Sequence, residues 1–416
     1  MENSDLSGQA DAKSTSFKFS KYQKFVVSLL AFLQFTIILD FMIMSPLGAI
    51  MMPTLKMSTA QFGAVVSAYA FSAGISGLLA AGFADKYDRK KLLMFFYTGF
   101  ILGTFLCGIA TSYYFLLIAR MVTGLFGGVI GSVVMAITTD LFPLTMRGRV
   151  MGFLQTAFAA SQILGIPVGL YLSNLWGWHM PFMLIVAISL VAFVVIAIYL
   201  KPINEHLKYK SDRNAALHLW HTLKNPQYMV AFATMGLMSI GGFMLMPFGS
   251  AFTVNNLGIA FDKLPLIYLI TGIAAIFIGP MVGRASDTFG KLKVFIFGAV
   301  LTIIMVLIYT NLGVTPISLV MTVNVLMFCA IFSRMIPAQA LMSAIPTPAN
   351  RGAFMAVTSS LQQIAGGVAS VIAGLIVVET SSGKLDHFDV LGYILTGTVM
   401  VSVYLMYNIS RQIEKK

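Results

Sequence analysis

The chain has 416 residues, of which 58% are hydrophobic and 10% are charged, and its formal net charge is +12. This composition excludes a disordered chain and argues against a soluble enzyme, because soluble domains are about 45–50% apolar and about 25% charged. The excess of basic residues indicates the cytoplasmic face of a membrane protein rather than a nucleic-acid partner.

Hydrophobic runs of helical length follow one another along the chain after a polar segment that ends at residue 24. A transmembrane helix needs about 20 apolar residues, and the first run is too long for the core of a signal peptide. The pattern predicts an all-α integral membrane protein with twelve transmembrane helices, at 25–51, 62–82, 92–111, 114–138, 149–173, 181–200, 227–250, 264–283, 293–311, 316–342, 352–378 and 389–409.

The distribution of Lys and Arg predicts how these helices are oriented. With residue 1 in the cytoplasm, 22 of the 27 basic residues lie in cytoplasmic segments, and three lie in outer loops at Lys56, Lys263 and Lys384. We therefore expect a multi-pass protein of a bacterial cytoplasmic (inner) membrane with both termini cytoplasmic.

Two cytoplasmic motifs repeat in the two halves of the chain. The pattern Arg-Gly-x-x-Met begins at Arg147 and again at Arg351, and an Asp followed four residues later by a basic residue occurs at 85–89 and again at 287–291. The two separations are nearly equal, which indicates a duplication; parallel six-helix repeats build one large transporter fold. The predicted domains are a cytoplasmic tail (1–24), an N-terminal half (25–200), a cytoplasmic linker (201–226), a C-terminal half (227–410) and a second tail (411–416).

The repeated motifs resemble those of the major facilitator superfamily. Residues 81–91 (AGFADKYDRKK) resemble its motif A, residues 283–291 (GRASDTFGK) the second copy of that motif, and residues 117–124 (LIARMVTG) motif B. The resemblance covers the chain after residue 24 and implies two pseudo-symmetric six-helix halves around a central cavity.

Two further motifs resemble particular branches of this superfamily. Residues 161–169 (SQILGIPVG) resemble the helix-5 antiporter motif, with Gly165, Pro167 and Gly169 as matching residues. Residues 39–47 (LDFMIMSPL) resemble the acidic helix-1 motif of drug:proton antiporters, whereas 164–167 and 177–178 are most similar to the sugar-efflux (arabinose-efflux-like) branch.

Three ionisable residues lie deep within the predicted helices: Asp40, Arg120 and Arg334. Ionisable residues are costly in a bilayer and are therefore functional candidates. Helices 1 and 4 border the cavity in the resembling fold, so Asp40 and Arg120 are expected to face each other and to couple transport to protons. The alternative is a static buried pair that only fixes helix packing.

Arg334 has no partner acid in any predicted helix. It is expected either to bind an anionic or hydroxyl-rich substrate or to form a hydrogen bond between helices. Four uncharged polar residues are weaker candidates for substrate binding, and their alternative role is also interhelical hydrogen bonding. They are Gln34, Thr36, Asn324 and Gln339.

The resemblance also implies a charge network that holds the two halves in the outward-open state. In this chain it would use Asp85 and Arg89 of motif A and Asp140 at the end of helix 4, with Asp287 and Lys291 in the second half. The alternative is a set of exposed salt bridges that contribute little to stability.

Glycines four residues apart in helix 4 form two pairs, Gly124 with Gly128 and Gly127 with Gly131. Such pairs let the backbones of neighbouring membrane helices approach closely. We therefore expect close helix packing along helix 4.

The leading functional prediction is a secondary active transporter that works by alternating access, as a proton-coupled exporter of a small organic molecule. The alternatives are proton-linked uptake or facilitated exchange of an organic anion or sugar, and a non-transporting membrane sensor. No catalytic residue, metal site or cofactor is expected, because all five histidines lie outside the predicted helices and the G-x-S-x-G, H-E-x-x-H and phosphate-loop motifs are missing from the sequence. The expected partners are substrate, protons and lipid, with no nucleic acid, and the expected functional unit is a monomer.

Overall fold

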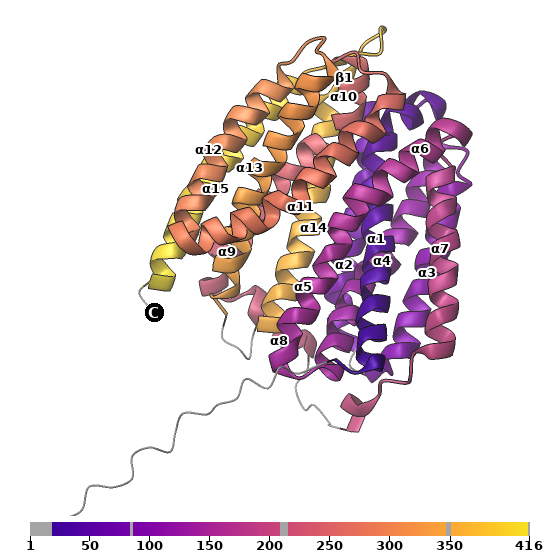
Figure 1. Ribbon diagram of the computed structural model, residues 1–416, viewed down its shortest axis with the longest axis vertical. Helices are drawn as coiled ribbons and strands as arrows, with labels where there is room; N and C mark the ends of the chain where they lie inside the picture. Colours follow the sequence, from indigo (N-terminus) through magenta and orange to yellow (C-terminus); the bar gives the residue numbers. More distant parts are fainter. Residues whose placement is uncertain (1–18, 84–85, 209–214, 347–350, 415–416) are drawn as a thin grey trace, which may run out of the picture.

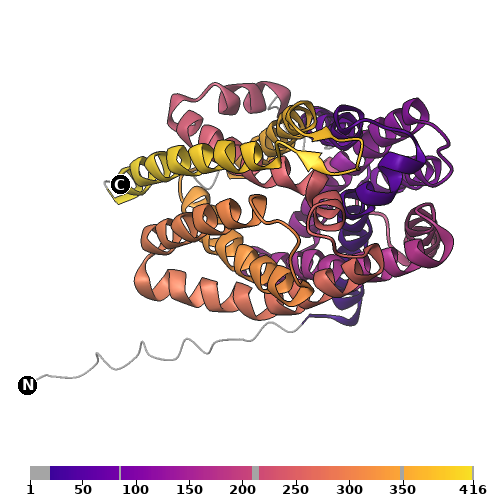
Figure 2. The same ribbon diagram turned by 90° about the horizontal axis from the view of Figure 1, so that it is seen from above.

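The computed structural model describes residues 19–83, 86–208, 215–346 and 351–414. It is almost entirely helical, with long helices that stand side by side (Figures 1 and 2). Within the described residues, 12 helical segments are long and apolar enough to cross a membrane. The predicted all-α membrane fold with twelve helices is confirmed.

Each predicted transmembrane helix corresponds to one of these segments. Those of the N-terminal half are α1 (Lys21–Thr54), α2 (Thr59–Phe83), α3 (Arg89–Gly108), α4 (Tyr113–Leu141), α5–η2–α6 (Leu144–Ala160, Ser161–Gly165 and Ile166–Trp176) and α7 (Met180–Tyr199). Those of the C-terminal half are α9–η4–α10 (Pro226–Leu245, Met246–Phe248 and Gly249–Asn255), α11 (Leu264–Phe289), α12 (Lys291–Thr310), α13 (Ile317–Ser343), α14 (Arg351–Ile376) and α15 (Phe388–Glu414).

Short elements connect these helices. A 3-10 turn, η3 (Glu205–Lys208), and α8 (Ala215–Leu223) lie between the two halves, and η5 (Phe261–Lys263) precedes α11. The strands β1 (Val378–Glu379) and β2 (Leu385–Asp386) pair in antiparallel fashion between α14 and α15, with Val378 opposite Asp386.

The helix ends correct several predicted boundaries. The predicted helix 352–378 ends earlier, at Ile376, because the residues that follow form the strand pair. Helix extends into both segments predicted as tails, 1–24 and 411–416, since α1 begins at Lys21 and α15 runs to Glu414. Charged residues in the first turn of α1 and the last turn of α15 extend these helices beyond their apolar windows, which a hydrophobicity pattern does not detect.

Side-chain caps fix where several helices begin. At the start of α1, the Gln23 amide donates to the Ser20 hydroxyl at 3.1 Å and the Ser20 amide donates to the Gln23 side chain at 3.0 Å. The Asp88 carboxylate accepts from the Lys91 amide at 3.0 Å at the start of α3. These bonds satisfy backbone donors that have no partner within the helix.

Proline interrupts one helix in each half. Pro167 follows the π-helical turn η2, and Pro247 lies within the 3-10 turn η4. Proline has no N–H, so one helical hydrogen bond is lost and the helix adjusts locally. In helix 5 this adjustment takes the form of the π-turn η2.

Glycines bring α2 close to helices on both of its sides. A Cβ added to Gly124 or Gly128 of α4 would lie 2.4 Å from a carbonyl oxygen of α2, that of Tyr69 or Ala73. The close packing predicted for this pair is confirmed, whereas a Cβ added to Gly131 would have no described atom of another helix within 4 Å.

The other side of α2 packs against α14 of the C-terminal half. A Cβ added to Gly63 would lie 2.6 Å from the Ser370 carbonyl oxygen, and one added to Gly77 would lie 3.2 Å from the Ser360 hydroxyl. The two halves therefore contact each other through small residues along much of α2.

The two halves are also joined at the end remote from the chain termini. Four hydrogen bonds between described residues connect them, namely Ser45 to the Met246 carbonyl, Ser250 to the Ser45 carbonyl, Thr59 to the Val377 carbonyl and Ser67 to the Gly367 carbonyl. Near η2, Gly272 of α11 packs against Ile163. Toward the termini, α11 diverges from α5 (Figure 1).

We expect Gly128→Ala to lower the thermal unfolding midpoint of the purified protein, because overpacking a tight contact costs about 1–3 kcal/mol. Gly131→Ala is the matched control on the same helix, and it should leave the midpoint unchanged or raise it slightly, since alanine is the better helix former. Equal midpoints for the two variants would contradict the close α2–α4 contact.

Candidate functional site

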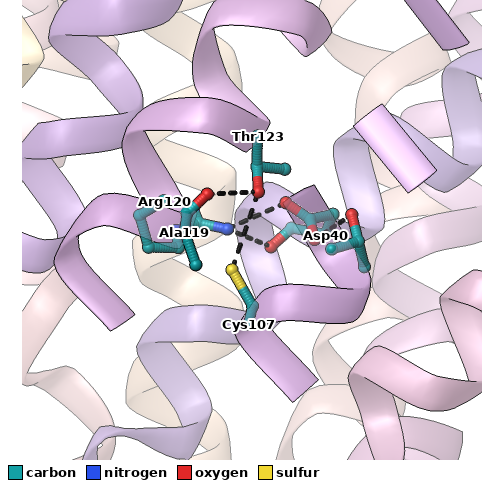
Figure 3. A network of polar contacts seen from close by, with 6 residues as sticks. Asp40, Cys107, Ala119, Arg120 and Thr123 are labelled. Carbon is teal, nitrogen blue, oxygen red and sulfur yellow. Dashed lines mark hydrogen bonds and ion pairs between the residues drawn. The ribbon is translucent and has the colours of Figure 1, made fainter. Parts of the chain in front are cut away.

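A buried ion pair joins α1 to α4 (Figure 3). Nη1 of Arg120 lies 2.8 Å from Oδ2 of Asp40, and both side chains are 0% exposed. Thr104 of α3 donates to Oδ1 of the same carboxylate at 3.1 Å. The predicted meeting of Asp40 and Arg120 is thus present in the structure, with Thr104 as a partner that the sequence pattern did not indicate.

Three more side chains lie around the pair. The guanidinium of Arg120 lies 4.5 Å from the ring centre of Tyr69 on α2, a distance at which the ring attracts a cation. Cys107 Sγ lies 3.6 Å from the hydroxyl of Thr123 (Figure 3). The first four helices all contribute to this cluster.

The ion pair leaves hydrogen-bonding capacity unused. Within the described residues, Nε and Nη2 of Arg120 are buried without a hydrogen-bond partner. A buried donor without a partner costs about 1–3 kcal/mol, and a bidentate pair with a carboxylate would have used two of these donors. The observed geometry therefore does not satisfy the guanidinium fully.

The helix-5 motif packs directly against α1 on both sides of Asp40. A Cβ added to Gly165 would lie 2.6 Å from a methyl group of Leu39, and one added to Gly169 would lie 2.8 Å from a methyl group of Ile43. The glycines at these positions therefore set how closely α1 can approach η2 and α6.

Aromatic rings connect the ion pair to the other half of the molecule. Phe41, next to Asp40 on α1, has its ring centre 5.3 Å from that of Tyr69 and 5.5 Å from that of Phe243 on α9. The environment of Arg120 thus reaches the C-terminal half through Tyr69 and Phe41.

Arg334 lies on α13 and is only 6% exposed. Its Nε is buried without a hydrogen-bond partner, and within the described part of the chain Arg334 forms no ion pair. Both roles predicted for Arg334 therefore remain predictions.

Within the described residues, the hydrogen bonds of two of the four uncharged candidates go to groups other than Arg334. Thr36 donates to the Leu33 carbonyl at 2.8 Å and lies 3.2 Å from the Tyr97 hydroxyl on α3, so it joins helices of the N-terminal half. The side-chain amide of Asn324 donates to the Val320 carbonyl of its own helix at 2.9 Å. Gln34 is half-buried and Gln339 is exposed.

The charge network of the motif A region is described in part, because Asp85 lies outside the described residues. Nε of Arg89, at the start of α3, lies 3.0 Å from Oδ2 of Asp140 near the end of α4, and the side chains are 5% and 21% exposed. This pair joins two helices of the same half. In the second half Asp287 is exposed and Lys291 half-buried.

Comparisons with known proteins agree with this architecture. A family model described as Major Facilitator Superfamily matches residues 30–370 and, separately, 237–410. The MFS-type transporter YceJ of Bacillus subtilis (strain 168), named as uncharacterized, is 27% identical over 270 residues, which cover 64% of this chain and 68% of YceJ. The multidrug resistance protein MdtG of Klebsiella pneumoniae (strain 342) is 27% identical over 256 residues, which cover 60% of this chain and 61% of MdtG.

Solved structures share the fold at low sequence identity. A bacterial homologue of the human lysosomal transporter Spinster, in an inward-facing and unoccupied conformation, has a TM-score of 0.76 at 14% identity, and the match covers 96% of this chain and 99% of that one. Since the family model matches most of the chain and the fold agrees along nearly all of it, the chain belongs to the Major Facilitator Superfamily and is a multi-pass membrane transporter of small molecules.

Proposed function

We propose that the protein exports a small organic molecule in exchange for protons, as a monomer in a bacterial cytoplasmic membrane with both termini in the cytoplasm. The observation that carries this proposal is the fully buried pair of Asp40 and Arg120, the latter with donors left unused. The similarity to MdtG, whose name is that of a multidrug resistance protein, supports export.

Asp40 is the proton-binding group in this proposal. In the present conformation Arg120 and Thr104 both donate to its carboxylate. With the termini in the cytoplasm, the four hydrogen bonds between the halves lie toward the outer side. Asp40 is deprotonated when substrate is taken up from the cytoplasm, and it is reprotonated after the halves have rearranged.

A change in the hydrogen-bond partners of Arg120 couples protonation of Asp40 to the change of conformation. Protonation removes the negative charge that Nη1 contacts, and a conformation that supplies acceptors to Nε and Nη2 is then favoured. A pair that served helix packing alone would gain stability from using these donors in the resting geometry.

The helix-5 motif gives α1 the freedom that this exchange requires. Gly165 and Gly169 present a surface without side chains to Leu39 and Ile43, and Pro167 leaves η2 and α6 short of one hydrogen bond. Small shifts of α1 against α6 therefore require little repacking next to Asp40.

Arg334 is the proposed substrate contact. It is a permanent positive charge in a buried position, and it lacks a partner acid within the described residues. A substrate carboxylate, phosphate or sulfonate would supply the missing acceptor.

We expect Asp40→Asn to abolish accumulation driven by a pH gradient while downhill exchange continues, because Asn cannot carry the proton. The measurement uses proteoliposomes and a labelled ligand found by thermal-shift screening of organic acids, sugars and drugs. In the wild type, acidification should also weaken ligand binding, since proton and substrate alternate on the carrier. Asp262→Asn, at an exposed residue, is the control; gradient-driven transport that persists in Asp40→Asn would refute the proposal.

We expect Arg334→Gln to weaken ligand binding by roughly 10- to 150-fold, the value of a charge-assisted hydrogen bond of about 1.5–3 kcal/mol. Its melting temperature without ligand should stay the same or rise, because a buried charge without a partner is removed. Arg284→Gln, at an exposed arginine of α11, is the control. Unchanged affinity together with a lowered melting temperature would exclude Arg334 from the substrate site.

We expect Arg89→Gln and Asp140→Asn to shift the protein away from the outward-open state by similar amounts, since each removes one side of the same ion pair. Spin labels at positions 91 and 293, both exposed and on opposite halves, report the separation of the terminal ends in a Cys329→Ala background. The distance distribution should move to longer values in both variants. Lys86→Gln is the control, and wild-type distances in both pair variants would mean that this pair does not bias the two states.

A further inference from the structure

A pocket of about 420 Å³ opens between α11, α12 and α13 in the C-terminal half. Its mouth is formed by large apolar side chains, with Met281 68% exposed, Phe289 68% and Phe297 61%. Cys329 and Ser333 of α13 form part of its wall. In a membrane protein, large apolar side chains exposed on the outside of the bundle face lipid rather than water.

One edge of the pocket lies at the ends of α11 and α12 that meet each other. Phe289 is the last residue of α11, and Lys293 lies in the first turn of α12, so both are at the end of the molecule that carries the termini. Phospholipid headgroups occupy this level of a membrane, and the acyl chains begin directly beneath it.

The charge at this corner of the molecule is positive. Lys293 is the one charged side chain that lines the pocket. Arg284 and Lys291 lie on the same helix ends, and Asp287 is the acidic residue among them. An apolar pocket with a lysine at the headgroup level matches a ligand that has a negative head and an apolar tail.

We propose that this pocket binds an anionic phospholipid, with an acyl chain packed against Met281 and Phe297 and the phosphate at the ammonium group of Lys293. The site is separate from the Asp40–Arg120 pair, which belongs to the other half, and it does not depend on the direction of transport. The pocket wall is formed from α11, α12 and α13. Of these, α11 diverges from α5 of the N-terminal half toward the termini (Figure 1).

The two cysteines of the chain provide a test. Cys107 is 0% exposed, whereas Cys329 is partly exposed in the wall of the pocket, so a maleimide should label Cys329 selectively. The labelling rate is measured on the full chain in detergent micelles, with phosphatidylglycerol or phosphatidylcholine added at the same mole fraction. Phosphatidylglycerol should slow the labelling and phosphatidylcholine should not.

Three variants distinguish recognition of the lipid headgroup charge from occupation of the apolar pocket. Lys293→Ala should weaken protection by phosphatidylglycerol about fivefold, which is the contribution of one basic residue near an anionic membrane surface. Lys91→Ala is the matched control, because Lys91 is an exposed lysine in the first turn of α3 in the other half, and it should behave as wild type. Ala285→Trp fills the pocket and should abolish retention of phosphatidylglycerol in native mass spectrometry although Lys293 is kept.

Several results would overturn the proposal. Equal protection by the two lipids would show that headgroup charge is not recognised, and protection by glycerol phosphate alone would assign the site to a soluble anion. Protection that increases with protein concentration but not with lipid would assign the surface to a second copy of the chain. Retention of phosphatidylglycerol by Ala285→Trp equal to that of the wild type would place the lipid elsewhere.

Discussion

The cost of burying charge in a bilayer determines the arrangement of the N-terminal half. A carboxylate and a guanidinium without any exposed surface can coexist only in contact, and Asp40 and Arg120 are 2.8 Å apart. That contact fixes α1 relative to α4, and Thr104 adds α3 to the same cluster. The glycines of η2, α6 and α4 then allow the neighbouring helices to approach as closely as this pair requires. Packing in this half is organised around one electrostatic interaction.

Much of this architecture could be predicted from the sequence, because the relevant signals are one-dimensional. A run of about 20 apolar residues predicts a transmembrane helix whatever its neighbours are. Charged residues within such a run are rare and are therefore easy to identify in the sequence. Asp40 and Arg120 could be paired in advance since each was the most plausible partner of the other. The same reasoning applied to Arg334 left two roles open, and within the described residues its buried Nε has no hydrogen-bond partner.

The features that sequence reasoning missed depend on three-dimensional packing. Tyr69 is one of 15 tyrosines, and nothing in its sequence context indicates that its ring lies against Arg120. Thr36 was grouped with Arg334 on polarity alone, but its hydroxyl lies beside Tyr97 on α3. The strand pair β1–β2 is two residues long in each strand, which is too short to produce a recognisable alternation. The π-turn η2 could not be predicted from Pro167, because a proline in the sequence shows that a helical hydrogen bond is lost but not how the helix compensates.

The contact between α2 and α14 has a consequence for solutes that dissolve in the lipid phase. From Gly63 to Gly77 the two helices are in close contact, through backbone atoms at Gly63 and through the side chains of Phe71 and Ile364 farther along. A hydrophobic molecule that diffuses within one leaflet therefore meets a continuous wall along this seam, at every depth the seam covers. Where α5 and α11 diverge, no such wall is built from these two helices (Figure 1). Lateral entry of a lipophilic compound from the bilayer would therefore occur on the side of α5 and α11 and not along α2 and α14. The composition of the surrounding leaflet would then influence which compounds reach the interior.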